Sequence, residues 1–274
     1  MEISTVRRII VRLVRRLQLP EYVFLVLVAF IIGVLAALGS YVFMKGIGFL
    51  WYECFLPLLH FGQSSFFLRP FIVFIPLIAA TLLFLIAKIF SPSIYGYGFP
   101  EFLVNVNLKG GVIRIRDVLA KIGASIITLG LGGSAGQEGP IAQIGGITGA
   151  CISHFFVASE QRRRTFIACG AAGAIAAVFN APIAGLFFAL EIVLLGDFEL
   201  TNFMPVVVSS GMGTITARAL LGNQTAFKMP PYTFVSLWEL FFYVLLGVFI
   251  GLLAYLFIRI FYKTKDYFRK MPCS

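Results

Sequence analysis

Charged residues make up only 12% of this 274-residue sequence, and this scarcity excludes an ordinary soluble domain. A soluble domain carries about 25% charged residues because its surface must stay hydrated. Hydrophobic residues account for 59% of the chain and its mean hydropathy is +0.95, so most of its outer surface is expected to face lipid. The composition therefore predicts an integral membrane protein.

Groups that could hold a metal are equally scarce. The chain has two histidines, His60 and His154, and its four cysteines show no CxxC spacing. Packing is the usual role of a free cysteine in or beside an apolar segment. The sequence also lacks the motifs HExxH, P-loop and dinucleotide fingerprint, so we expect neither a metal nor a cofactor.

Apolar runs are abundant but uneven in length. Eight of them could each form a helix: 22–50, 71–90, 118–131, 140–156, 165–178, 182–195, 203–221 and 235–262. Some exceed the ~20 residues needed to cross the hydrocarbon core, whereas others are too short. Short apolar helices broken by glycine and proline occur at membrane depth only where protein or a cavity surrounds them. This mixture predicts broken helices rather than a simple bundle.

The net charge of +10 raises the possibility of nucleic-acid binding, but the positions of the basic residues argue against it. Eighteen of the 22 lysines and arginines fall in five places, separated by apolar runs. Such segregation between alternate loops is the positive-inside pattern, and it places both termini in the cytoplasm. We expect a multi-pass protein, in the cell membrane, that binds lipid rather than nucleic acid.

Residues 1–19 contain five arginines with apolar residues between them. This pattern predicts an amphipathic helix at the cytoplasmic interface, attracted to anionic lipid. A signal peptide is the alternative interpretation, but the long basic region and the unbroken apolar run after it disfavour that reading.

Two glycine-rich segments interrupt otherwise helical sequence. The first is Gly96-Tyr97-Gly98-Phe99-Pro100-Glu101, and the second runs from Gly132 through Glu138 to Pro140. In each, an extended stretch feeds a helix with proline in its first turn, where proline is well tolerated. The sequence therefore predicts two helices that begin at membrane depth.

A helix start is a natural anion site. Its first amides have no intrahelical partners, and it carries about half a positive charge. The attraction grows in a low-dielectric interior, and glycine lets the bare backbone approach an ion. Two such starts aimed at one point would bind an anion without a lysine or arginine, which favours release and hence passage.

Glu138 stands at the second of these helix starts. A carboxylate inside a membrane is costly and is a functional candidate by default. There it could occupy the anion site as a tethered ligand, and its protonation would free the site. The structural alternative is that Glu138 only caps its own helix.

Two other interpretations of this region are alternatives to an anion site. Gly132-x-Ser134-x-Gly136 matches the nucleophile elbow of serine hydrolases, but no strand precedes it and no Asp–His pair is evident. We therefore expect no enzyme. The pairs Gly145-xxx-Gly149 and Gly173-xxx-Ala177 are typical of close helix packing and receive no function.

Three motifs in register give the chain a family resemblance. The Gly-x-Gly-x-Pro turn, the Gly-x-Glu-Gly-Pro segment and the stretch 171–185, with Asn180-Ala181-Pro182 at its centre, resemble the CLC family of chloride channels and proton-coupled chloride transporters. The resemblance runs from about Tyr22 to the last residue. It implies an all-α polytopic fold of inverted repeats with broken and re-entrant helices.

The resemblance also implies roles for residues. Glu138 matches the external gating glutamate, and Gly136, Gln137 and Gly139 match positions whose amides line the anion path. Tyr97, with Gly98, falls where many members have a serine that contacts the central anion. The implied assembly is a homodimer, held by the apolar helices around residues 182–195 and 203–221, and the implied cargo is chloride or a similar inorganic anion.

Two departures from the family pattern matter. Members that exchange protons often carry an internal glutamate after the Asn-Ala-Pro helix; that position is Ile192 here, with Glu191 one residue earlier. One residue turns an α-helix by about 100°, so Glu191 is expected to face elsewhere. Channel and anion/proton antiporter both stay open.

The second departure is length. We expect residues 20–222 to form the first repeat, and residues 223–274 to form the first helix of the second repeat with a basic cytoplasmic tail. A second half, in a longer chain or in another polypeptide, would then complete the anion site. The alternative is a truncated, non-conducting fragment or an accessory membrane subunit.

Overall fold

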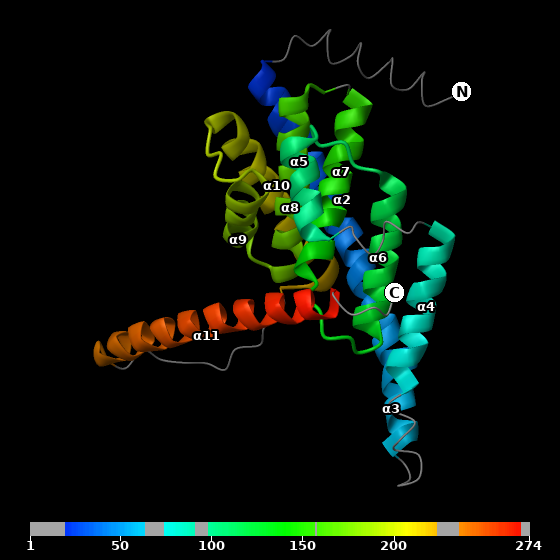
Figure 1. Cartoon of the computed structure of the whole chain (residues 1–274). Coiled ribbons are helices and arrows are strands. Elements are labelled where there is room, and N and C mark those ends of the chain that lie inside the picture. The colour runs from blue at the N-terminus through cyan, green and yellow to red at the C-terminus, as the bar shows by residue number, and fades with distance from the viewer. Residues whose placement is uncertain (1–19, 64–73, 91–97, 157, 224–235, 270–274) are drawn as a thin grey trace. The chain divides into compact units, whose positions relative to one another are not determined.

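The computed structural model describes residues 20–63, 74–90, 98–156, 158–223 and 236–269 (Figure 1). These residues form helices and the connections between them, without a strand. Among the described residues, three helices are long and apolar enough to cross a membrane: Glu21–His60, Leu200–Leu221 and Trp238–Tyr267. The predicted all-α, polytopic membrane architecture is confirmed. The amphipathic helix predicted for residues 1–19 lies outside the described residues.

Each of the eight apolar runs contains or overlaps a helix. In chain order the elements are α2 (Glu21–Phe49), η1 (Leu50–Phe55), α3 (Leu56–Gln63), α4 (Phe74–Phe90), α5 (Phe99–Leu108), α6 (Ile115–Gly130), α7 (Glu138–Phe156), α8 (Glu160–Phe179), α9 (Pro182–Phe187), η4 (Phe188–Val193), α10 (Leu200–Leu221) and α11 (Trp238–Arg269).

The first helix is longer than its apolar run predicts. After α2 the chain passes through the π-helical turn η1 and continues as α3 to Gln63. Pro57 lies at the second position of α3. Proline has no backbone N–H to donate, and its ring clashes with the preceding turn. A regular α-helix therefore cannot run through it unchanged. A wider π-helical turn directly before Pro57 is one way to accommodate this break.

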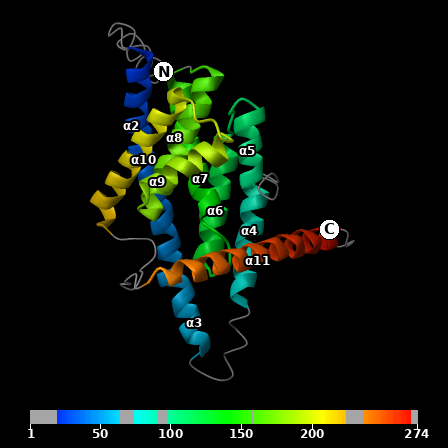
Figure 2. The ribbon, with the colours of Figure 1, turned by 90° about the vertical axis from the view of Figure 1, so that its left-hand side faces the viewer.

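Helix α8 is the centre of the packed unit formed by residues up to Ala226. All residues from Thr165 to Ala177 are buried, and α8 packs against α2, α7, α9 and α10. Figure 2 shows α10 crossing α2, with α8 and α7 behind the crossing. Because alanine and glycine dominate α8, its neighbours approach it closely on every side.

Glycine makes these close approaches possible. A Cβ atom added at Gly145 would overlap the carbonyl of Gly170, and one at Gly149 would overlap the carbonyl of Phe166. Between α10 and α8, a Cβ at Gly213 would overlap the carbonyl of Gly173. The close helix packing predicted for Gly145-xxx-Gly149 and for Gly173 is thereby confirmed, since these glycines lie directly against neighbouring backbone.

Polar contacts fasten the ends of the packed helices. The guanidinium of Arg162, at the start of α8, forms an ion pair of 2.5 Å with the carboxylate of Glu21 at the start of α2. Inside the bundle, the hydroxyl of Thr165 donates to the amide oxygen of Asn202 over 2.6 Å. Asn202 in turn donates to Asp197 over 2.9 Å. These bonds join α8 to the start of α10.

Helix α11 belongs to a second compact unit, residues 227–274. Its described side chains are exposed or partly exposed, apolar in the first two thirds and basic towards the end, with Arg259, Lys263 and Lys265. An apolar helix of this length is suited to lipid. The division into a first repeat and the first helix of a second stays a prediction.

Candidate functional site

The extended stretch before α7 is shaped by its glycines. Helix α6 ends at Gly130, and Gly132 adopts a left-handed backbone with φ of 84°. A Cβ atom at Gly132 would lie 2.6 Å from the ring of Phe55, and one at Gly133 would lie 2.6 Å from the carbonyl oxygen of Thr128. Both contacts are too short for a real side chain. The chain can therefore turn this tightly between two helices only with glycine here.

Glu138 is the first residue of α7, and its side chain is exposed. A Cβ atom added to Gly136 would overlap a carboxylate oxygen of Glu138. The glutamate therefore folds back over the extended stretch instead of pointing away from it. Gly136 is exposed, whereas Gln137 and Gly139 are half-buried, so the predicted site residues form one small patch at the helix start.

The backbone amides of this patch are available to a ligand. The first intrahelical bond of α7 is donated by Ile141 to the carbonyl of Gln137, over 3.0 Å. Among the described residues, no backbone bond is donated by the amides of Gly136, Gln137, Glu138 or Gly139. A helix start with free amides carries partial positive charge. The patch can thus attract an anion.

The second helix start is that of α5. Gly98 precedes it with an extended backbone, Pro100 occupies the first turn, and Phe102 donates the first intrahelical bond to the carbonyl of Gly98 over 3.2 Å. This confirms the helix expected after the Gly-x-Gly turn. Tyr97, the remaining predicted site residue, lies outside the described residues.

The fold brings these two helix starts together. A Cβ atom built on Gly139 would lie 3.5 Å from the Cβ of Phe99, which is an ordinary van der Waals contact. Further along the same pair, Gly146 of α7 lies against the ring of Phe102 of α5. Segments about 40 residues apart in sequence therefore start their helices side by side.

Phe99 is a site residue that the sequence-based prediction missed. Its ring lies 5.8 Å from that of Phe102 and 5.8 Å from that of Phe188, at the first position of η4. It thereby connects the starts of α5 and α7 with the segment after α9. An aromatic residue directly before a helix-starting proline was the available signal, but only the fold shows what it touches.

The Asn180-Ala181-Pro182 motif forms a third break. Asn180 ends α8 in a left-handed conformation with φ of 52°, and Pro182 begins α9. The side-chain oxygen of Asn180 accepts a bond of 2.7 Å from Arg218, near the end of α10. This contact fixes the turn that leads into α9 and η4.

The expectation for Glu191 rests on α-helical geometry that the structure does not have. Residues Phe188–Val193 form a π-helix, in which each turn holds more residues than an α-helical turn. The rotation of about 100° per residue therefore does not apply here. Glu191 and Ile192 are both exposed. The exposure of the two side chains therefore does not distinguish the position of Glu191 from that of Ile192.

The segment that matches the nucleophile elbow is not preceded by a strand in the structure. Ser134 is exposed in the stretch before α7, and helix α6, not a strand, precedes it. In the described parts of the chain, no group of three or more His, Cys, Asp or Glu side chains is placed to hold a metal ion.

Comparison with known proteins relates this chain to chloride channels and chloride/proton exchangers. The family model described as "Voltage gated chloride channel" matches residues 77–273. The chain is 27% identical over 263 residues to the H(+)/Cl(-) exchange transporter ClcA of Yersinia pseudotuberculosis, which covers 95% of this chain and 55% of that protein. It is 32% identical over 187 residues to the H(+)/Cl(-) exchange transporter ClcA of Vibrio parahaemolyticus. That match covers 65% of this chain and 39% of the Vibrio protein.

Solved structures share the fold. A slow cyanobacterial Cl-/H+ antiporter superposes with a TM-score of 0.80 at 23% identity, over 93% of this chain and 60% of the antiporter chain. A CLC-type fluoride/proton antiporter gives a TM-score of 0.67 at 24% identity, over 85% of this chain and 55% of the antiporter chain. The chain thus spans about half the length of the curated relatives it matches.

Proposed function

This chain belongs to the voltage gated chloride channel family, and on that premise we propose that it serves the passage of chloride, or a similar inorganic anion, across a membrane. Relatives named as H(+)/Cl(-) exchange transporters support anion transport as the general activity. Both a voltage-gated-type channel and an anion/proton antiporter are compatible with the residues described. Replacing Ser134 with alanine should leave anion flux unchanged, because the proposal assigns it no chemistry.

The observation that carries the proposal is the meeting of two helix starts. The starts of α5 and α7 lie so close that a Cβ atom added to Gly139 would be in van der Waals contact with Phe99. Each start exposes amides with partial positive charge, and the field of such charges is stronger in a membrane interior than in water. An anion held by amides alone is bound without a full counter-charge and can leave again.

Glu138 is the proposed gate. Its carboxylate is tethered at the first position of α7 and folds back towards Gly136, next to the amides that would hold an anion. A carboxylate is itself an anion, so it competes with chloride for those amides. Protonation removes its charge and ends the competition. Gating and proton exchange then share one group.

Exchanging Glu138 for glutamine tests this role, because glutamine mimics the protonated acid. In a protein completed by its second half, we expect E138Q to bind chloride more tightly in isothermal titration calorimetry and to lose the pH dependence of chloride efflux from liposomes. Glu160 is a matched control, since it is also an exposed glutamate at the first position of a helix. E160Q should behave as wild type. Identical binding and flux for E138Q and wild type would contradict the gate.

A proton gradient separates the two modes of transport. If Glu191, on the exposed side of η4, relays protons, then E191Q should stop chloride-driven proton uptake into liposomes while chloride flux continues. If the protein is a channel, wild type and E191Q will both show chloride flux without proton uptake.

We also propose that the active assembly is larger than this chain. Large apolar side chains stay exposed along α9 and α10, among them Ile183, Phe187 and Ile215, which supports a homodimer through this face. The relatives' additional length supports a second repeat, in one longer chain or in a second polypeptide, as part of the anion site. Chemical cross-linking in membranes and flux with and without that second half test both points.

A further inference from the structure

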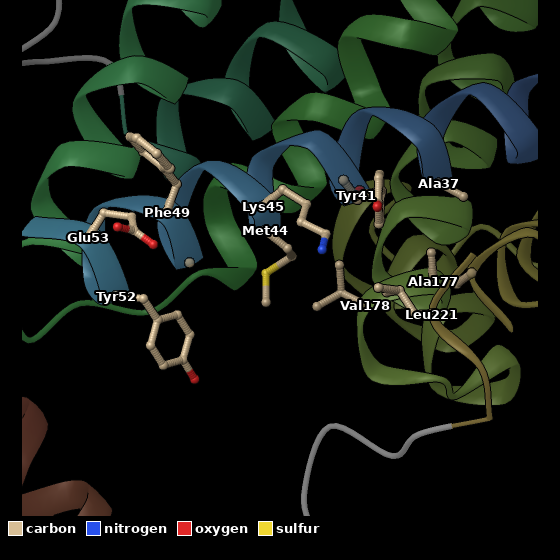
Figure 3. A pocket seen from close by; sticks show the side chains of 13 residues that line it. Ala37, Tyr41, Met44, Lys45, Phe49, Tyr52, Glu53, Ala177, Val178 and Leu221 are labelled. Atoms are coloured by element: carbon tan, nitrogen blue, oxygen red, sulfur yellow. The ribbon is translucent and has the colours of Figure 1, made fainter. Parts of the chain in front are cut away.

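A pocket of about 490 Å³ lies away from the two helix starts, between α2, η1, α8 and α10 (Figure 3). None of the residues assigned to the anion site lines it. Its volume is within the ~300–1,000 Å³ typical of small-molecule sites. Apolar side chains form most of its wall, including Met44, Phe49, Val178 and Leu221. The pocket is therefore suited to a hydrocarbon chain.

The length of the uncharged stretch of α2 indicates which part of the pocket would lie near a membrane surface. Between Glu21 and Lys45 the helix α2 contains 23 consecutive uncharged residues. At 1.5 Å per residue they span about 35 Å, slightly more than the ~30 Å of a hydrocarbon core. Tyr41 and Tyr52 also line the pocket, and tyrosine is enriched at the boundary between membrane and water. Lys45 thus marks the headgroup level.

Besides the two tyrosines, the pocket is lined by the polar side chains of Ser40, Lys45 and Glu53, in this order along the chain. Ser40 is 1% exposed, and its hydroxyl has no hydrogen-bond partner within the described chain. Lys45 follows about 7.5 Å further along the helix axis, and Glu53 follows on η1. Figure 3 shows Glu53 at one end of the pocket and Ala37 and Ala177 at the other, with Lys45 between them.

Among the residues that the structure describes, neither Lys45 nor Glu53 has an ion-pair partner. The ammonium of Lys45 lies 5.7 Å from the ring centroid of Tyr41. Because helical side chains lean towards the helix N-terminus, Glu53 leans towards the level of Lys45. A ligand that carries both an anionic and a cationic group would complement the pair.

We propose that this pocket binds one phospholipid of the ethanolamine class. From the membrane interior outward, such a lipid presents an acyl chain, ester carbonyls, a phosphate and a primary ammonium group. The pocket presents an apolar wall, the ammonium of Lys45 and the carboxylate of Glu53 to the acyl chain, the phosphate and the primary ammonium, in the same order. The site is independent of the proposed anion pathway.

The chemistry distinguishes this lipid from others. A phospholipid without an amine would place an uncharged headgroup near Glu53, with no cation to pair that carboxylate. A choline headgroup carries the charge but has no N–H to donate, whereas a primary ammonium forms charge-assisted hydrogen bonds to a carboxylate. The order of preference is therefore ethanolamine, choline, then glycerol headgroups.

Native mass spectrometry of the full chain tests this proposal, with three phospholipids that differ only in headgroup: ethanolamine, choline and glycerol. Wild type should retain the ethanolamine lipid about two- to fivefold more than the glycerol lipid, the range of a solvent-accessible ion pair. E53Q should remove that preference. K45M should lower the bound fraction of all three by a similar factor.

Two controls and one pocket variant complete the experiment. K88M and E160Q remove an exposed charge of the same kind outside the pocket and should match wild type. Ala217→Leu narrows the pocket without changing charge and should reduce all three lipids; circular dichroism confirms that each variant is folded. The proposal is overturned if wild type shows no headgroup preference, if K45M equals K88M, or if wild type retains no lipid because another polypeptide covers the pocket.

Discussion

The carboxylate of Glu138 occupies the space into which a side chain at Gly136 would project. The Glu138 carboxylate can lie there only because Gly136, two positions earlier, has no side chain. Among the described residues, the amides from Gly136 to Gly139 in the same stretch donate no backbone hydrogen bond. A glycine at position 136 is therefore a condition for the glutamate to fold back, and the two residues are coupled in the proposed gate.

Replacing Gly136 with alanine should displace the Glu138 carboxylate. We expect G136A to weaken the pH dependence of chloride flux from liposomes, in the direction of E138Q, because the acid can no longer reach the amides. Gly123, on α6, has open space around an added Cβ, so G123A is the control and should retain wild-type pH dependence. A G136A flux profile equal to that of G123A would contradict the coupling.

Replacing Gly149 with alanine should destabilise the bundle. An added Cβ would overlap the carbonyl of Phe166, and backbone cannot move aside as the end of a flexible side chain can. Overpacking of this kind costs about 1–3 kcal/mol. Thermal unfolding in detergent should show a lower midpoint for G149A. Gly211 on α10 has no atom within 4 Å of an added Cβ, and G211A should not lower the midpoint.

Asn180 should tolerate glycine better than alanine. Its left-handed backbone costs a residue with an ordinary side chain roughly 1–2 kcal/mol, a penalty that glycine avoids. Both variants lose the bonds to Arg218 and Asn223, of 2.7 and 3.0 Å. The unfolding midpoint should thus fall in the order wild type, N180G, N180A. Equal midpoints for the two variants would show that backbone conformation is not the cause.

The ion pair between Arg162 and Glu21 should contribute little to stability. Its side chains are 40% and 63% exposed, so water screens the attraction. A double-mutant cycle with R162M and E21Q should give a coupling free energy of at most ~1 kcal/mol. The coupling should shrink further at high salt, because mobile ions screen exposed charges. A coupling above about 2 kcal/mol that resists salt would refute this assignment.

Much of the fold follows from local sequence. The apolar runs predict the helices, and the glycine–proline segments predict where α5 and α7 begin, because both properties depend on neighbouring residues. The π-helical segments η1 and η4 were not predictable. A single wide turn depends on how the helix meets Pro57 or its packing partners, and hydrophobic periodicity does not register it.

The candidate site likewise has one part that the sequence predicts and one part that it does not. Glu138 and its flanking glycines are recognisable in the sequence because a carboxylate is rare in an apolar segment. The part played by Phe99 is not recognisable, since its contacts with Phe188 and with the start of α7 join distant segments. The pocket near Lys45 was missed for the same reason, as it takes residues from four elements.

By itself, the sequence determined that this is a helical membrane protein with two broken helices and an acidic residue at one break. These properties arise from composition and from local backbone chemistry. Only the tertiary structure decided that the two helix starts meet, that Glu138 folds back over Gly136, and that a pocket opens near Lys45. Those relationships depend on how closely α2, α7, α8 and α10 can approach, and backbone contacts at glycine set those distances.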